Sequence, residues 1–346
     1  MNVPAARGHS VARIDDVARA AGVSRATVSR VINGRVTVDP LLAEKVRRAA
    51  GELNYQPSPV ARSLSLGRTL AVGLVVPDLA NPMFQAVLHS LSQAAEGDGY
   101  RVLVSDTAES PEREAAVIRD TRNRCDAVVL VAPRLSDSEL SRLLPELDPV
   151  ILLNRVAPGG EAPSVGVDYA AAAFAAVEHL VSLGHRRLVY LAGPRASASN
   201  WLRLAGLDRA TAAFPDLAVD VIPCGQSMSH GFAVAEAVLA SRATGVVAYN
   251  DLVAFGLLAR LRGLNVGVPD ELSVTGFDDI ELAGYAIPAL TTMNVPYEEL
   301  GIRAWERLRS QTEGTAARVA TEILPTRLVV RASTGPSPQA PFPGKE

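Results

Sequence analysis

Apolar runs of strand length alternate with helix-type patterns through most of the chain, and this alternation constrains the fold more than any other sequence feature. Continuous apolar runs predict strands buried on both faces, and the amphipathic segments between them predict helices. The alternation therefore predicts parallel sheets covered by helices on both faces. The expected strands are residues 70–78, 101–105, 127–131, 150–153, 188–191, 219–222, 246–248 and 272–275, and the expected helices are residues 81–96, 111–124, 136–144, 168–183, 200–213, 229–240 and 251–262.

A second set of alternating elements begins near Asp168, which predicts two α/β lobes with a cleft between them. Ligands of open α/β sheets bind beyond the carboxyl ends of the strands, so the cleft is the expected ligand site. With 346 residues, the chain is long enough for a large core and a small extra domain.

The segment IDDVARAAGVSRATVSRVINGR, residues 14–35, has the pattern of two short helices separated by a tight turn. Gly22 lies at the turn, where only glycine takes a positive φ without steric cost, and Ser24 is a good N-cap for the second helix. The small Ala18 lets the two helices cross closely. This layout predicts a helix-turn-helix whose second helix enters the DNA major groove; an ordinary pair of helices with a solvated polar face is the alternative. The apolar positions are Val17, Ala18, Ala21, Val28, Val31 and Ile32.

A third helix is expected from Pro40 to about Leu53, and the segment NYQPSPVARSLSLGRT follows it. Ser58 and the proline after it can open a helix of about eight residues, which is too short to be stable alone in water. Val60 and Leu64 share one face of that helix, as packing against a second copy requires. Without its neighbours the segment would be interpreted as a plain linker.

Charge is distributed unevenly along the chain. Residues 1–68 contain 11 Lys+Arg and 5 Asp+Glu, whereas the remainder contains 23 basic and 32 acidic residues. A basic head on an acidic body fits a head that binds a polyanion, although chance variation on a solvated surface gives the same imbalance.

Cys125 and Cys224 are far apart and lack the spacing of metal ligands, which favours a reduced, cytoplasmic setting without a metal or cofactor. The N-terminus has no apolar signal core, and no apolar run is long enough to cross a membrane, so we expect neither export nor a membrane partner.

The chain resembles the lactose/galactose repressor (LacI/GalR) family of transcription regulators from about Arg13 to Arg331. Seven motifs occur in the family's order. They are IDDVARAAGVSRATVSRVING, NYQPSPVARSL, LVVPDLANPMF, HLVSLGHRRL, YNDLVAFGLL, VPDELSVTGFDDIELA and PALTTMNVPYEELG. The resemblance implies an α-helical helix-turn-helix DNA-binding head, a hinge helix, and an α/β two-lobed body like that of the type I periplasmic binding proteins.

The resemblance also implies domain bounds, with three chain crossings between the lobes. The expected domains are a flexible arm (1–12), a helix-turn-helix domain (13–56), a hinge helix and linker (57–69), an effector-binding domain (70–332) and a disordered tail (333–346). Lobe 1 is expected at about residues 70–165 and 295–321, and lobe 2 at about residues 166–294 and 322–332.

The family's base-reading positions correspond to Arg25 and Ala26, with Arg30 one turn later. Arginine can bond bidentately to guanine, whereas Ala26 offers only an apolar contact. Four polar residues, Ser24, Thr27, Ser29 and Asn33, are expected to contact phosphates. In the hinge, which corresponds to residues 58–66, Val60, Ala61 and Leu64 are expected in the minor groove, with Leu64 as the wedge that opens the central base step. The family usually has Asn where this chain has Ser58.

Six positions match the family's effector site, namely Asn81, Phe84, Arg155, Arg203, Asn250 and Asp278. Trp201 is added as a second aromatic platform, although the family has no fixed aromatic residue there. Polar groups around an aromatic face suit a polyhydroxylated ligand. Each residue also has a purely structural interpretation, since Asp278 could cap a helix and Phe84 could belong to the core. A sugar is the expected effector; purines and nucleosides stay open.

The resemblance thus implies a repressor that binds a palindromic operator as a homodimer under the control of a small molecule. The Pro-rich tail lacks a leucine repeat, which favours a dimer over a tetramer. An enzyme is the first rival, but the Gly97–Gly99 segment precedes a strand instead of following one, and no nucleophile or phosphate-loop motif is present. A solute-binding protein is the second rival, and the basic head argues against it.

Overall fold

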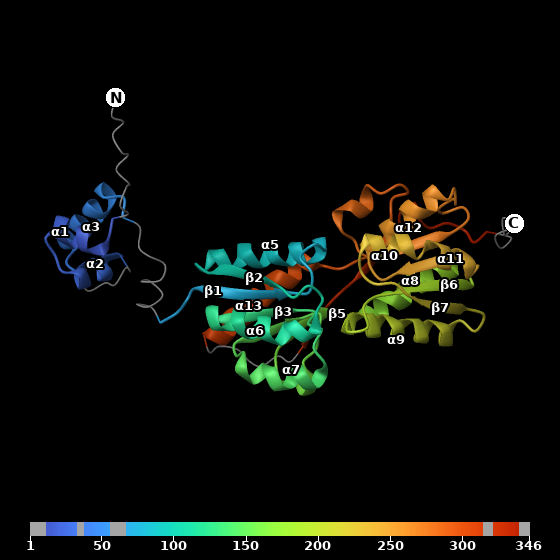
Figure 1. Cartoon of the computed structure of the whole chain (residues 1–346), viewed down its shortest axis with the longest axis horizontal. Coiled ribbons are helices and arrows are strands. Elements are labelled where there is room, and N and C mark those ends of the chain that lie inside the picture. Colours follow the sequence, from blue (N-terminus) through green and yellow to red (C-terminus); the bar gives the residue numbers. More distant parts are fainter. Residues whose placement is uncertain (1–11, 33–37, 56–66, 314–320, 339–346) are drawn as a thin grey trace, which may run out of the picture. The chain divides into compact units, whose positions relative to one another are not determined.

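The computed structural model describes residues 12–32, 38–55, 67–313 and 321–338. The chain divides into two compact units, residues 1–70 and residues 71–346, which are described separately (Figure 1). In the described residues no helix is long and apolar enough to cross a membrane.

The first unit contains three helices, α1 (Ile14–Ala21), α2 (Arg25–Ile32) and α3 (Pro40–Glu52). Val17, Val28 and Val46 come one from each helix and are fully buried, so they form the centre of a small core. Gly22 ends α1 with φ 66° and ψ 35°, the left-handed conformation that the turn requires. The expected helix-turn-helix and third helix are confirmed.

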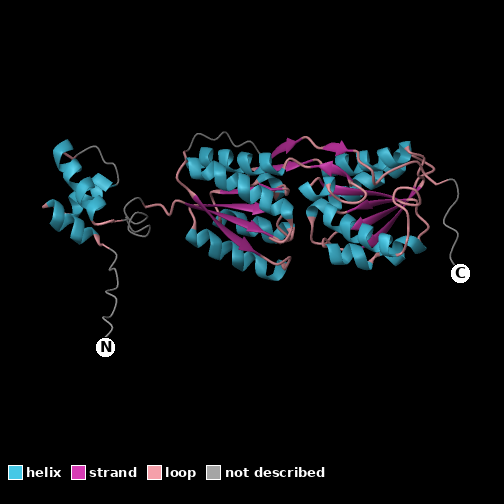
Figure 2. Ribbon diagram, turned by 90° about the horizontal axis from the view of Figure 1, so that it is seen from above, coloured by secondary structure: helices cyan, strands magenta, loops and turns pink. Residues whose placement is uncertain are grey.

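Lobe 1 of the second unit is built on a six-stranded parallel sheet in the order β11-β5-β4-β3-β1-β2. Helices cover both faces (Figure 2); α5 packs against α13 on one face, and α6 and α7 cover the other. The strands are β1 (Ala71–Val76), β2 (Arg101–Asp106), β3 (Ala127–Val131), β4 (Val150–Leu153), β5 (Ser164–Val167) and β11 (Thr321–Leu324), and the helices are α5 (Pro82–Gly97), α6 (Pro111–Arg124), α7 (Asp137–Leu143) and α13 (Tyr297–Thr312).

Lobe 2 repeats this architecture with the order β12-β10-β9-β8-β6-β7, in which only β12 is antiparallel to its neighbour. Helices α8 and α9 pack together on one face, and α10, α11 and α12 cover the other. The strands are β6 (Arg187–Ala192), β7 (Ala218–Pro223), β8 (Gly245–Ala248), β9 (Ser273–Asp278), β10 (Thr291–Asn294) and β12 (Arg327–Val329), and the helices are α8 (Tyr169–Ser182), α9 (Ala198–Ala213), α10 (Met228–Ala233), α11 (Ala235–Ala240) and α12 (Asp251–Gly263).

The chain crosses between the lobes three times: from β5 to α8, from β10 to α13, and from β11 to β12. Two expected lobe bounds are displaced. Strands β5 and β11 pair with each other in lobe 1, so residues 166–167 and 322–324, which were expected in lobe 2, belong to lobe 1. Lobe 1 extends further than expected in both segments, because the pairing between β5 and β11 continues to the last residue of each strand.

Residues 229–240 form two helices instead of the single one expected. Val234 separates α10 from α11 with ψ −7°, well away from the helical value. The apolar periodicity of the sequence continues through this break, so the pattern did not predict that the helix would be interrupted.

The expectation of a disordered tail is wrong for residues 333–338. Ser333 is fully buried; its hydroxyl donates to the Val274 carbonyl at 2.6 Å and accepts the Thr291 amide at 2.8 Å. The Gly335 amide donates to the Ser273 hydroxyl at 3.0 Å. Composition indicated disorder, but lobe 2 supplies hydrogen-bond partners for this backbone.

Candidate DNA-binding and effector-binding sites

Helix α2 presents a polar surface opposite its buried valines. Arg25, Ala26 and Arg30 are exposed on it. Ser24 and Thr27 bond to each other, since their hydroxyl oxygens are 2.9 Å apart and Ser24 also accepts the Thr27 amide at 3.1 Å. Ser24 thus caps α2 as expected, and both hydroxyls lie at the amino end of the helix. The DNA contacts assigned to these residues and to Ser29 remain predictions; those of Asn33, Val60, Ala61 and Leu64 lie outside the described residues.

Arg25 forms an ion pair with Asp15 of α1, with 2.9 Å between Nε and the carboxylate. Both side chains are largely solvent-exposed, at 69% and 48%, so the pair is weak and can be exchanged for a stronger bond to a base. Substitution of Arg25 by alanine is expected to relax base preference at one or two operator positions by about 1–3 kcal/mol. Selection from a randomised operator library measures this change.

Arg19→Ala is the matched control, because Arg19 is also an exposed arginine and pairs with an aspartate, Asp16, on α1. It is expected to leave base preference unchanged. An Arg25→Ala protein that selects the wild-type sequence would contradict the assignment.

The body brings five of the seven expected effector residues together in one pocket between the lobes. Lobe 1 contributes Asn81 and Phe84 from the start of α5, and lobe 2 contributes Arg203, Asn250 and Asp278. All five are buried. The pocket lies beyond the carboxyl ends of strands in both sheets, as expected for this architecture.

Arg203 is the most enclosed charge in this pocket, with 2% of its surface exposed. The centre of its guanidinium group lies 4.5 Å from the ring centre of Tyr169, 4.6 Å from that of Tyr249 and 3.9 Å from that of Phe277. Its Nη1 donates to the Ser199 carbonyl at 3.1 Å, while its buried Nε has no hydrogen-bond partner among the residues that the structure describes. Cation–π contacts hold the group in place and leave this N–H available to a ligand.

Asp278 is the acidic counterpart of Arg203. It ends β9 with φ 114°, a strained conformation for a residue with a side chain, and the Tyr297 hydroxyl donates to its carboxylate at 2.5 Å. Burial raises the pKa of Asp278 to about 7, although Arg203 and the Tyr297 bond act in the opposite direction. Burial, together with the charge of Asp278, also raises the pKa of the neighbouring Asp251.

The two amide side chains fix the helices that begin at the pocket. Asn81 accepts the Met83 amide at 3.0 Å and so caps α5. Asn250 accepts the Val253 amide at 2.9 Å, caps α12, and donates to the Gln226 carbonyl at 3.0 Å. Both residues therefore have a capping role in addition to the predicted ligand role.

Sequence reasoning missed three tyrosines and an ion pair in the pocket wall. The three tyrosines are Tyr169, Tyr249 and Tyr297, and each follows the end of a strand by a few residues. Since ligands of such sheets bind beyond the carboxyl ends of the strands, this position could have identified them as candidate site residues. Arg134 follows β3 and binds Glu109 through both carboxylate oxygens, at 2.7 and 2.8 Å. No sequence spacing connects Arg134 with Glu109, because tertiary packing brings them together.

The free volume of the pocket is about 20 Å³, which is room for about one water molecule. Side chains of both lobes therefore fill most of the pocket. A sugar-sized ligand requires the lobes to part or side chains to move.

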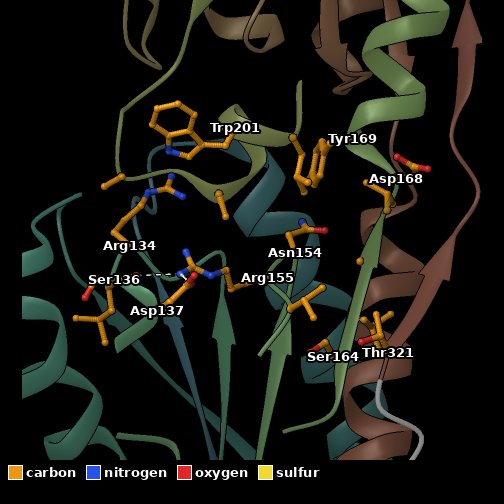
Figure 3. A pocket seen from close by; sticks show the side chains of 18 of the residues that line it. Arg134, Ser136, Asp137, Asn154, Arg155, Ser164, Asp168, Tyr169, Trp201 and Thr321 are labelled. Carbon is orange, nitrogen blue, oxygen red and sulfur yellow. Dashed lines mark hydrogen bonds and ion pairs between the residues drawn. The ribbon is translucent and has the colours of Figure 1, made fainter. Parts of the chain in front are cut away.

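Arg155 and Trp201 do not line this pocket, so the structure does not support their grouping with the other five. Arg155 is held by the carbonyls of Pro133 and Leu135 and by Asp137 at 2.6 Å. Trp201 lies two residues before Arg203 on α9, and residues two apart on a helix point in nearly opposite directions. Both line a neighbouring cavity (Figure 3).

The three-helix head and the two-lobed body with its polar pocket define the class of ligand-binding helix-turn-helix DNA-binding proteins. Residues 13–58 match the model of bacterial regulatory proteins of the lacI family, and residues 177–334 match the periplasmic binding protein-like domain. The chain belongs to the LacI family of transcription regulators, and it is a DNA-binding regulator.

Individual relatives agree with this assignment. The chain is 33% identical to the HTH-type transcriptional regulator GalR of Escherichia coli K12, over 93% of this chain and 96% of that one. It is 30% identical to the HTH-type transcriptional repressor CytR of the same strain, over 95% and 98% of the two chains. The Lac repressor dimer bound to operator and the anti-inducer ONPF matches with a TM-score of 0.84 at 28% identity, over 94% of this chain and all of that one.

Proposed function

We propose that this protein is a repressor that binds a palindromic operator as a dimer and is controlled by a small molecule bound between its lobes. One observation supports this above all others. A buried guanidinium group with an unpaired N–H, Arg203, lies with the Asp278 carboxylate opposite residues of the other lobe, in a chain that has a helix-turn-helix head. A ligand that binds these groups from both lobes changes the free-energy difference between open and closed bodies.

A sugar or sugar derivative is the proposed effector. Carboxylate, guanidinium and amide groups bond vicinal hydroxyls, and Phe84 with the pocket tyrosines provides flat apolar faces. A solved relative, the regulator CelR, is a cellobiose complex and matches with a TM-score of 0.68 at 28% identity. Nucleosides offer similar hydroxyls and are the alternative.

An apolar surface of lobe 2 is the proposed contact with a second copy of the chain. Tyr285 and Ile287 are 75% and 77% exposed, and Met228 and Leu282 lie with them around one groove. Exposed apolar patches of this kind mark interaction sites. A related protein is a dimer on its operator, and dimerisation here would place two heads on the two halves of a palindrome.

The test is a thermal-shift screen of sugars and nucleosides, followed by gel-shift assays of each hit on genomic fragments. We expect a salt-dependent complex with specific DNA fragments, and we expect a ligand found in the screen to change the affinity of that complex. The proposed site of action is the cytoplasm, where the DNA is. A solute-binding protein would give ligand hits without any such complex. A screen without hits combined with specific DNA binding would remove the effector from the proposal.

Effector affinity is expected to rise with pH through about 7. The ionised carboxylate of Asp278 accepts hydrogen bonds from ligand hydroxyls, whereas its protonated form must first lose a proton, and burial raises the pKa to about 7. Below about pH 7 the effector affinity should fall roughly tenfold per pH unit, because binding then requires the loss of one proton. The Arg203 charge and the hydrogen bond from Tyr297 lower the pKa of Asp278, and the pKa of Asp251 is itself raised, mainly by burial. Calorimetric titration at several pH values measures the slope. Asp278→Asn should bind more weakly and without this slope; the same slope in that variant would assign the titration to another group.

A further inference from the structure

The turn that follows β9 joins the pocket between the lobes to the chain crossings. It contains Asp278 and Asp279, which both have a positive φ, at 114° and 56°. Asp278 lines the pocket, whereas Asp279 lies outside the pocket wall with 11% of its side chain exposed. Two successive residues with side chains and a positive φ are uncommon, and such a turn needs support from the contacts around it.

Asp278 contacts the second crossing, residues 295–296. Its backbone carbonyl accepts the Val295 amide at 3.4 Å, and its carboxylate accepts the Tyr297 hydroxyl at 2.5 Å. Tyr297 is the first residue of α13 and belongs to lobe 1, whereas Asp278 belongs to lobe 2. A ligand group that takes the place of this hydroxyl therefore removes a direct bond between the lobes.

Asp279 binds two further groups, one beside each of two crossings. Asn294 ends β10, immediately before the second crossing, and its Nδ2 donates to one carboxylate oxygen of Asp279 at 3.0 Å. Arg331 follows β12, which the chain enters from the third crossing, and its Nη2 donates to the other oxygen at 2.7 Å. In the pairing of β10 with β12, Asn294 lies opposite Arg327, so these two crossings meet lobe 2 side by side.

The ion pair between Asp279 and Arg331 is partly shielded from water. The two side chains are 11% and 24% exposed, so water and salt screen this pair less than a surface pair. Arg331 is also fixed in place, since its Nη1 donates to the Leu290 carbonyl at 2.8 Å and its amide donates to the Thr291 hydroxyl at 2.9 Å. A displacement of Asp279 is therefore passed to the backbone after β12.

The other end of the turn is fixed to α12. The Ile280 amide donates to one carboxylate oxygen of Asp251 at 2.9 Å, and the Thr292 hydroxyl donates to the other at 2.6 Å. With Ile280 held in this way, a change in the position of Asp278 must be taken up by the residue between them, which is Asp279.

We propose that Asp279 is a positioning residue that couples Asp278 to the two crossings, so that a change at the pocket reaches the segment after β12. This proposal deepens the proposed function and rests on it for the assignment of Asp278 to the effector. A ligand at Asp278 moves Asp279, which in turn moves Asn294 and Arg331. Without the Asp279 carboxylate the pocket still binds a ligand, but the crossings do not respond.

A double-mutant cycle on the full chain tests this coupling, and amide hydrogen exchange is the measurement. The reporter is the Ala332 amide, which donates to the Ala289 carbonyl at 3.0 Å, next to Arg331. Asp278→Asn is expected to raise the exchange rate of this amide by about fivefold or more. In an Asp279→Asn background the same substitution should change the rate by less than about twofold. Asparagine tolerates a positive φ, so both variants keep the turn.

Variants of Arg331 separate the ion pair from packing. Arg331→Gln should abolish the response to Asp278→Asn, whereas Arg331→Lys keeps a positive charge opposite Asp279 and should retain part of it. Arg119→Gln is the matched control, because Arg119 forms an ion pair of the same 2.7 Å length with Glu146 in lobe 1. It should leave the response unchanged.

Additive effects, in which Asp278→Asn raises the exchange rate equally with and without the Asp279 carboxylate, would overturn the proposal. So would an unchanged Ala332 rate in the Asp278→Asn chain. If Asp279→Asn unfolded lobe 2, the Arg331→Gln background would provide the same cycle. None of these measurements includes a ligand. Additive effects would therefore leave the proposed effector standing, and a ligand screen without hits would leave the measured coupling standing.

Discussion

Arg203→Ala is expected to abolish the response to the effector while operator binding persists. The guanidinium group lies among three aromatic rings with an unpaired Nε, so the substitution removes a preorganised, desolvated donor. Charge-assisted bonds in such surroundings contribute about 3 kcal/mol, which is a loss of at least a hundredfold in effector affinity. Calorimetry measures the affinity, and a gel shift with and without effector measures the response.

Arg209→Ala is the matched control on the same helix. Arg209 is exposed, and its guanidinium carbon lies 5.6 Å from the centre of the Phe174 ring. Its loss should leave effector affinity unchanged. If Arg203→Ala retained wild-type affinity in a folded protein, the effector would have to bind elsewhere.

Gly256→Ala is expected to destabilise lobe 2 by about 3 kcal/mol. Helices α10 and α12 cross backbone to backbone, and a Cβ at Gly256 would lie 1.9 Å from the Met228 carbonyl oxygen. The reciprocal contact is as tight, since a Cβ at Gly231 would lie 2.0 Å from the Val253 carbonyl oxygen. Backbone atoms cannot yield as a flexible side chain does, so the helices must separate. Thermal unfolding should show a decrease of about 10 °C in the melting temperature.

Gly263→Ala provides the comparison, because Gly263 ends the same helix and a Cβ there would meet nothing within 4 Å. Its effect should stay within about 0.5 kcal/mol or be slightly stabilising. Equal melting temperatures for the two variants would show that the helix crossing is not as close as described.

Much of the body could be predicted from sequence because each buried strand is a short apolar run between turn signals. Strands β3 and β4 have the predicted bounds, and α6 begins and ends at the predicted residues. Strands β5, β10, β11 and β12 were not predicted individually. β11 and β12 are short, lie at sheet edges and are only partly apolar, so their identity depends on the strand beside them.

The tail illustrates the same limit. Its Pro/Gly/Ser content favours disorder by composition, yet Ser333 and Gly335 are hydrogen-bonded into lobe 2. Composition describes what a segment does alone in water. It contains no information about partners that another part of the chain provides.

By itself, the sequence determined the helix-turn-helix, the two α/β lobes and, through the family motifs, the five residues that meet in one pocket between the lobes, because each depends on local periodicity or on a motif at the end of one element. Only the tertiary structure decided that Arg155 and Trp201 belong to a different cavity, that Tyr169, Tyr249 and Phe277 enclose Arg203, and that the side-chain amide of Asn154 has no hydrogen-bond partner among the described residues. These facts depend on distances between segments that are far apart in the chain. Tertiary packing determines those distances, and local sequence patterns contain no information about them.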